Sequence, residues 1–172
     1  MDRLAVDAVD GLESNRLDVC AAVPPRTLVA YADGACEPVN PGGTATFGVV
    51  LYDEHGQELA AECGVIMRGL GATNNVAEFA AAACAMQLVR ALGVPPGSHL
   101  TLHGDSQLWV RMLNGIGGPR TLDAPYVPFY EQAGDELAAL RADGITVTIT
   151  WVPREQNQRA DALSKRALTV RA

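Results

Sequence analysis

The pattern of apolar and polar positions becomes regular at Thr27 and predicts alternating strands and helices from there onward. Short apolar runs bounded by turn residues indicate strands at 27–33, 45–53, 58–67, 99–105 and 145–152. Longer periodic stretches indicate helices at 73–92 and 158–168, a short helix at 106–115 and a further helix that ends near 141. Strands that are joined partly by helices predict an α/β fold, in which helices pack on a mixed sheet.

Turn and cap residues mark the ends of several elements. The turn EHGQ at 54–57 joins the second and third strands as a hairpin. Thr73 or Asn74 can cap the start of the long helix, and Gly93 with Pro95 and Pro96 ends it. The first three strands therefore form a meander, whereas the last two are reached through helices.

The domain is expected to span residues 27–170, and residues 1–26 are interpreted as an N-terminal appendage. The appendage ends in AAVPPR, whose double proline breaks regular structure, and segment 4–19 forms a weak helix or stays disordered. Acidic residues among the first apolar ones argue against a secretory leader. No apolar run approaches the roughly 20 residues of a membrane span. The four cysteines form no CxxC pair, which favours free thiols in the cytoplasm.

Four acidic residues stand at positions where a site can form. Asp33 and Asp105 end predicted strands, Glu78 lies early in the long helix, and Asp161 lies in the first turn of the last helix. Ligands of open α/β sheets bind outside the carboxyl ends of the strands, so these side chains are expected to meet there. Clustered carboxylates repel one another, and hard divalent cations such as Mg²⁺ compensate them.

Each of these acids also has a local interpretation. Asp33 with the following glycine is typical of a turn, and Asp105 before Ser106 is typical of a helix cap. Glu78 alone is typical of a solvated helix face, and Asp161 can pair with Lys165 one turn later. Their joint occurrence, in this order and with these neighbours, favours a metal site.

The blocks DGAC, NPGG, TNNVAE, GDSQ and WVPREQNQRAD resemble type 1 ribonuclease H from about Thr27 to Leu168. The resemblance implies a five-stranded mixed sheet, with a three-strand antiparallel meander, two parallel strands and helices on both faces. It also implies an endoribonuclease that hydrolyses the RNA strand of RNA–DNA hybrids with two Mg²⁺ ions, or Mn²⁺ as a substitute. The products would carry 5′-phosphate and 3′-hydroxyl ends. The four catalytic and metal-binding positions match Asp33, Glu78, Asp105 and Asp161.

The same resemblance implies a set of substrate contacts. Thr73 matches a position that contacts a DNA-strand phosphate, and Asn157 lies four residues before the last aspartate, as in family members. Positions that touch the minor groove of the hybrid match Cys36, Asn40, Asn74, Asn75 and Gln107. Amide side chains both donate and accept, which suits the 2′-hydroxyl that distinguishes RNA from DNA. Locally, the two asparagines can equally cap the helix, and Cys36 can be a small buried residue.

Three features depart from the family pattern. The loop VPREQNQ lacks the histidine of many members, and Arg154 or Glu155 is the candidate auxiliary group in its place. The basic helical protrusion of some members is absent, because the stretch 115–125 has a single basic residue, Arg120. Weaker affinity for the hybrid is therefore expected. The first glycine-rich loop is longer, with residues 37–39 inserted before Asn40.

The net charge of −7 is unusual for a nucleic-acid binder and keeps a second interpretation open. That interpretation is a non-catalytic ribonuclease-H-like scaffold or nucleic-acid-binding module. A third is a nuclease of the same fold that acts on double-stranded RNA or DNA. For the favoured enzyme we expect a monomer without an obligate protein partner and without a membrane association.

Overall fold

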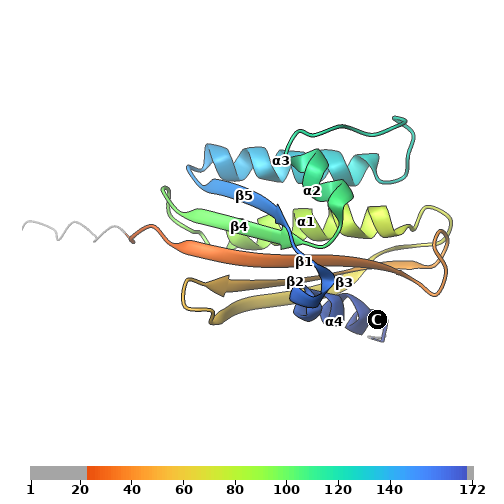
Figure 1. Cartoon of the computed structure of the whole chain (residues 1–172), viewed down its shortest axis with the longest axis horizontal. Coiled ribbons are helices and arrows are strands. Elements are labelled where there is room, and N and C mark those ends of the chain that lie inside the picture. Colours follow the sequence, from red (N-terminus) through yellow and green to blue (C-terminus); the bar gives the residue numbers. More distant parts are fainter. Residues whose placement is uncertain (1–22, 170–172) are drawn as a thin grey trace, which may run out of the picture.

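The computed structural model describes residues 23–169, which form one mixed sheet covered by helices (Figure 1). In chain order the elements are β1 (Thr27–Glu37), β2 (Thr44–Asp53), β3 (Glu58–Arg68), α1 (Asn74–Ala91), β4 (His99–Gly104), α2 (Gln107–Leu113), α3 (Val127–Ala142), β5 (Thr146–Trp151), the 3₁₀ turn η1 (Arg154–Gln156) and α4 (Gln158–Arg166). The order of elements predicted from the sequence is confirmed. The predicted appendage lies mostly outside the described residues.

The strand order across the sheet is β3-β2-β1-β4-β5. β1 pairs antiparallel with β2, and β2 pairs antiparallel with β3. β1 pairs parallel with β4, and β4 pairs parallel with β5. The expected meander with two added parallel strands is therefore confirmed, and β1 is the strand at which the direction of the sheet changes.

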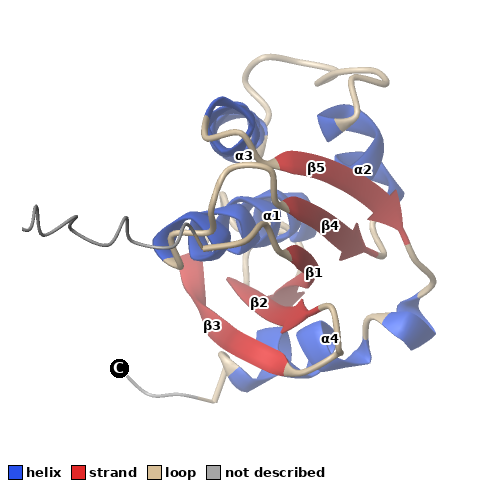
Figure 2. Ribbon diagram, turned by 90° about the vertical axis from the view of Figure 1, so that its left-hand side faces the viewer, coloured by secondary structure: helices blue, strands red, loops and turns tan. Residues whose placement is uncertain are grey.

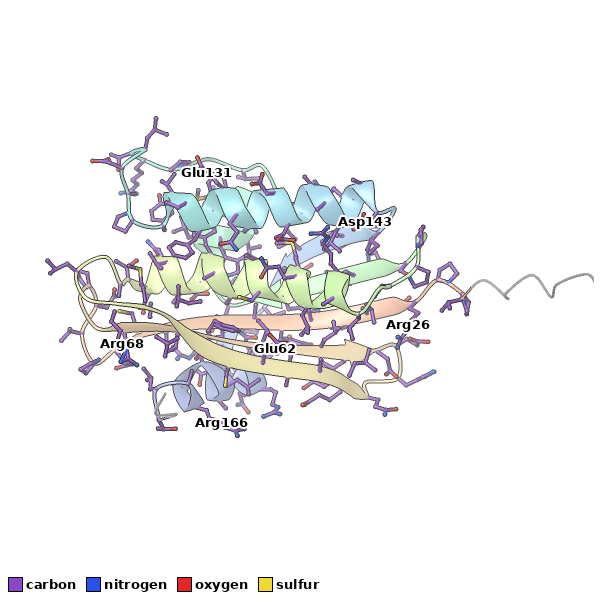
Figure 3. All side chains as sticks on the ribbon, turned by 180° about the vertical axis from the view of Figure 1, so that it is seen from behind. Arg26, Glu62, Arg68, Glu131, Asp143 and Arg166 are labelled. Atoms are coloured by element: carbon purple, nitrogen blue, oxygen red, sulfur yellow. The ribbon has the colours of Figure 1, made fainter. Side chains whose placement is uncertain are left out.

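Helices cover both faces, as expected. α1, α2 and α3 lie on one face, while α4 packs against β1, β2 and β3 on the other (Figure 2). The core between the sheet and α1 is built from alternate residues of β1, namely Leu28, Ala30 and Ala32, because successive side chains of a strand point to opposite faces. Arg90 at the end of α1 pairs with Glu136 of α3 and with Asp143. Asp143 lies just beyond the end of α3 (Figure 3). Of the helices in residues 23–169, none has the length and apolar character needed to cross a bilayer.

β1 is longer than the sequence predicted, and the expectation that it ends at Asp33 is wrong. Its antiparallel pairing with β2 continues to Glu37 opposite Thr44, whereas its parallel pairing with β4 stops at Tyr31 opposite His103. Asp33 therefore lies inside a strand, just beyond the point where β1 and β4 separate, and not in a turn. The separation opens the sheet at this point.

Two glycines let helices approach the opened region. A Cβ atom on Gly34 would lie 2.2 Å from the backbone carbon of Ala77 in α1. A Cβ atom on Gly48 would lie 2.3 Å from the carbonyl oxygen of Ala160 in α4. Gly48 is also the residue of β2 directly opposite Asp33. Both helices thus contact the strands backbone to backbone, one on each face, beside Asp33.

Candidate metal and active site

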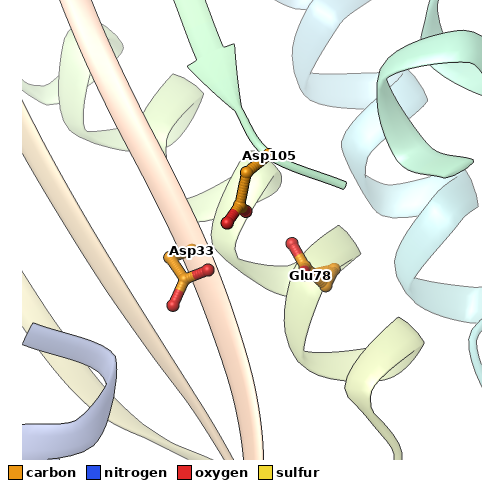
Figure 4. A group of neighbouring side chains, drawn as sticks. All are labelled: Asp33, Glu78 and Asp105. Atoms are coloured by element: carbon orange, nitrogen blue, oxygen red, sulfur yellow. The ribbon is translucent and has the colours of Figure 1, made fainter. Parts of the chain in front are cut away.

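Asp33, Glu78 and Asp105 come together where β1 and β4 separate (Figure 4). Each offers one carboxylate oxygen, and these atoms all lie within 4.8 Å of one another. Asp33 lies on β1, Glu78 lies on α1, and Asp105 comes directly after β4. Residues more than 20 positions apart in the chain thereby form one acidic group.

The position of Glu78 follows from the packing of the start of α1. Thr73 caps this helix, because its hydroxyl oxygen accepts a 3.1 Å hydrogen bond from the backbone N–H of Val76. Because Gly34 has no side chain, the backbone of α1 at Ala77 and Glu78 can pack directly against β1. The side chain of Glu78 is consequently directed toward the gap between β1 and β4 and not toward solvent.

Asp33 is nearly buried, with an exposed fraction of 5%. Burial, helped by the charges of Asp105 and Asp161, raises the pKa of its carboxyl group from 3.8 to about 6. A 2.8 Å hydrogen bond from the hydroxyl group of Ser164 to Oδ2 opposes this effect. Ser164 belongs to α4, which can reach Asp33 because Gly48 carries no side chain.

Glu78 is in a still less favourable environment for a lone charge. Burial raises the pKa of this residue well above its ordinary value, and the charges of Asp33 and Asp105 add to the rise. Its Oε2 atom is buried and has no hydrogen-bond partner among residues 23–169. Buried carboxylates of this kind need compensation by a cation, and an all-oxygen set suits Mg²⁺ or Mn²⁺. The residues present therefore fit a divalent metal.

Asp105 is held by Trp151, the last residue of β5, and by Asn157, which precedes α4. The indole N–H of Trp151 donates a 2.9 Å hydrogen bond to the backbone oxygen of Asp105. The side-chain amide of Asn157 donates to Oδ1 of Asp105 at 3.3 Å and to the backbone oxygen of Ala32 at 3.0 Å. Asn157 has an exposed fraction of 1%, so its side chain lies inside the protein, where it connects β1 to Asp105.

Asp161 lies outside the group of three but close to it, since its charge raises the pKa of Asp33. Arg154 approaches its Oδ1 atom at 2.7 Å, and Lys165 approaches its Oδ2 atom at 2.6 Å. Partial burial raises the pKa of Asp161, but hydrogen bonds from Lys165 and Arg154 outweigh this and hold it below the usual value. Asp161 is thus ionised and already paired with two cations. Glu155, the other candidate loop residue, is exposed.

The predicted substrate contacts cluster around the start of α1. The backbone N–H of Cys36 donates to Oδ1 of Asn74 at 2.9 Å, and the backbone N–H of Asn74 donates to Oδ1 of Asn40 at 3.1 Å. A pocket of about 310 Å³ is lined here by Asn40, Pro41, Thr73, Asn74, Asn75, Ala124, Pro125 and Tyr126. Gln107 is exposed at the start of α2, while Cys36 is buried.

Several residues that shape the site were missed at the level of sequence. Ser164, Trp109, Trp151 and Gly48 belong to elements that were predicted, but their contacts join segments far apart in the chain. Ser164 alone carried a local signal, since it lies three residues after Asp161 on the same helix and donates to the Asp161 backbone oxygen.

Three comparisons with known proteins each match most of the chain. A family model described as reverse transcriptase-like matches residues 32–167. Ribonuclease HI of Halobacterium salinarum is 34% identical over 154 residues, which are 88% of this chain and 70% of that protein. The crystal structure of RNase H1 from Halobacterium salinarum superposes with a TM-score of 0.69 and 33% identity, covering 83% of this chain and 98% of the other. The structure of LC11-RNase H1 in complex with an RNA/DNA hybrid gives a TM-score of 0.69 and 28% identity, covering 83% and 96%.

Proposed function

The chain belongs to the type 1 ribonuclease H family and is a ribonuclease H, and from this premise we propose that it hydrolyses the RNA strand of RNA–DNA hybrids with divalent metal ions. The observation that carries the proposal is the convergence of Asp33, Glu78 and Asp105 within 4.8 Å of one another. A similar protein, LC11-RNase H1, has been crystallised with an RNA/DNA hybrid, which supports this substrate.

We propose that Asp33, Glu78, Asp105 and Asp161 hold two Mg²⁺ ions, with Mn²⁺ as a substitute. Such ions supply an activated water molecule and neutralise charge on the leaving oxygen, so the products would carry 5′-phosphate and 3′-hydroxyl ends. Within this scheme Ser164 keeps the Asp33 carboxylate oriented, and Asn157 keeps that of Asp105 oriented. Fixed ligands lower the cost of assembling the charged site before hydrolysis.

The amide residues near the start of α1 are proposed to recognise the RNA strand. Asn40, Asn74 and Asn75 are exposed beside the pocket, and Gln107 is exposed at the start of α2. Each can donate and accept a hydrogen bond, as a 2′-hydroxyl group does. Thr73 is proposed to lie against a DNA-strand phosphate. Cys36 and Asn157 are buried, and we assign to them the support of Asn74 and of Asp105, respectively.

We further propose that the catalytic domain spans residues 27–170 and acts as a monomer in the cytoplasm, with residues 1–26 as an appendage. Cleavage assays test the substrate class. A hybrid with a long ribonucleotide run should be cut, whereas double-stranded RNA, double-stranded DNA and a duplex with one embedded ribonucleotide should be cut far more slowly. Efficient cutting at the single ribonucleotide would contradict a type 1 activity.

One observation favours the alternative of a non-catalytic module. Arg154 and Lys165 already neutralise Asp161, so one of the four proposed ligands is paired without a metal. Thermal unfolding with increasing Mn²⁺ separates the two proposals. A metal site stabilises the folded state by mass action, whereas a scaffold without a site would show no such rise in Tm.

A further inference from the structure

Trp109 is a fully buried residue of α2 that packs directly beneath the end of β4. Its ring occupies the space that a side chain at position 104 would need, since a Cβ atom on Gly104 would lie 2.0 Å from Cζ2 of the ring. Gly104 is the last residue of β4 and directly precedes Asp105. The ring therefore packs against Gly104, the residue that precedes the candidate metal ligand Asp105.

The polar edge of the same ring faces a second candidate ligand. Burial and the charges of Asp33 and Asp105 raise the pKa of Glu78, while the neighbouring indole N–H of Trp109 acts in the opposite direction. Even so, Nε1 of Trp109 and Oε2 of Glu78 are both buried and both lack a well-formed hydrogen bond to residues 23–169. A buried donor beside a buried acceptor, each unpaired, is rare in proteins because each group has given up its bonds to water.

We propose that Trp109 is a positioning residue for Glu78. Its indole N–H donates to Oε2 when a divalent cation occupies the site, so that the other oxygen stays directed toward Asp33 and Asp105. This inference rests on the proposed metal-dependent function and adds to it a residue that holds one metal ligand in place.

The chemistry of the two side chains supports this assignment. Glutamate has three rotatable bonds, so a single metal contact does not fix its carboxylate plane, whereas the packed ring on Gly104 has no freedom to move. A hydrogen bond to an ionised carboxylate is stronger than one to a neutral group. Groups that orient metal ligands commonly change metal affinity by tenfold or more. If filling the core were the only requirement, an apolar ring would serve as well, and tryptophan adds the N–H group.

The N–H group can be removed while the shape of the ring is kept. Incorporation of 3-benzothienylalanine at position 109 of the full chain replaces the indole N–H by sulfur. We expect the midpoint of Mn²⁺-dependent thermal stabilisation to rise about tenfold, as a lost hydrogen bond to a charged group implies. The matched control is Leu113→Ala, which removes buried packing from the same helix and should lower Tm without moving the Mn²⁺ midpoint. An unchanged midpoint in the sulfur-containing protein would overturn the role of Trp109.

A second measurement uses the unaltered protein and does not depend on a variant that folds. The chain has two tryptophans, so its spectrum shows two indole N–H signals, which Trp151→Phe assigns. On addition of Mg²⁺ the Trp109 signal should move downfield and exchange more slowly with solvent. A Trp109 signal that does not respond, in a protein that Mg²⁺ stabilises, would overturn the inference alone. Absence of any stabilisation by Mg²⁺ or Mn²⁺ would overturn the metal-dependent function and this inference with it.

Discussion

Ser164 of α4 donates a 2.8 Å hydrogen bond to Oδ2 of Asp33 in β1, although 131 positions separate the two residues. Ser164 is fully buried, and the contact exists because α4 packs on Gly48, the residue of β2 opposite Asp33. The C-terminal helix therefore does more than cover the sheet. It delivers the group that keeps a buried carboxylate closer to its ionised form.

Ser164→Ala should raise the pKa of Asp33 above about 6, because the hydrogen bond that opposes the effect of burial is lost. Protons then compete better with the metal ion for Asp33. In the pH dependence of the hybrid-cleavage rate at limiting Mn²⁺, the acidic limb should move to higher pH by about one unit. The control is Ser98→Ala, which removes another buried serine, one that bonds Arg26. Coinciding pH profiles for the Ser164 variant and the unaltered protein would contradict the account.

Asp33→Asn should stabilise the metal-free protein at neutral pH. The folded-state pKa of Asp33 is raised from 3.8 to about 6, so its contribution to stability is present in full below pH 3.8 and is lost as pH rises through about 6. Asparagine has no such loss, and the free energy of unfolding should be up to about 3 kcal/mol higher above pH 6. Chemical denaturation of both proteins in EDTA between pH 4 and 8 measures the difference.

Asp53→Asn is the control, because it should change the free energy of unfolding in the opposite direction. Backbone N–H groups of Gln57 and His55 donate to Asp53, and together they lower its pKa although burial opposes them. Its contribution to stability is present above pH 3.8 and lost as pH falls, so this variant should be less stable than the unaltered protein at neutral pH. If both variants changed stability in the same direction, the assigned environment of Asp33 would be wrong.

Gly34→Ala should disturb the site through the backbone of α1. The new methyl group would overlap the backbone at Ala77 and Glu78, so the helix must move away from β1. We expect a loss of about 1–3 kcal/mol in the free energy of unfolding and a weaker response to Mn²⁺. Gly134→Ala in α3 is the control, since nothing lies within 4 Å of the added methyl group. It should raise stability by up to about 1 kcal/mol, as expected for glycine in a helix.

Arg154→Ala should strengthen Mn²⁺ binding. The guanidinium group competes with metal for Asp161, to which it lies 2.7 Å away, and its removal frees the carboxylate. The Mn²⁺ midpoint in thermal unfolding should fall, with a change of under about 1 kcal/mol in metal-free stability because Arg154 is exposed. Arg159→Ala is the matched control, since Arg159 pairs with Glu58 at 3.0 Å. A midpoint that rises in the Arg154 variant would contradict the competition.

Much of the fold and the identity of the acidic residues could be predicted from the sequence. Apolar periodicity predicted β1–β5 and α1–α4 but not η1, and the order of Asp33, Glu78 and Asp105 along these elements predicted that they meet. The continuation of β1 to Glu37 could not be predicted, because it depends on pairing with β2 after β4 has separated. The local sequence DGAC is equally compatible with a turn.

The contacts that tune the site were beyond a reading of the sequence alone. Ser164, Trp109 and Asn157 act on carboxylates through tertiary packing, which apolar patterns do not encode. Asn157 was expected among the substrate contacts from its place before Asp161, and the structure places its amide inside the protein against Asp105. A buried amide such as that of Asn157 can support a metal ligand, whereas an exposed one can contact substrate. Which of the two applies depends on burial, which the sequence does not give.

The most direct test of the central claim is the rate of hybrid cleavage by Asp105→Asn relative to the unaltered protein, in Mg²⁺ and in Mn²⁺. The substitution keeps size and the hydrogen bond from Trp151 to the backbone of Asp105, but it removes the charge from a shared metal ligand. We predict a fall of roughly a hundredfold or more with both metals. Cleavage at an undiminished rate would show that Asp33, Glu78 and Asp105 do not form the catalytic metal site.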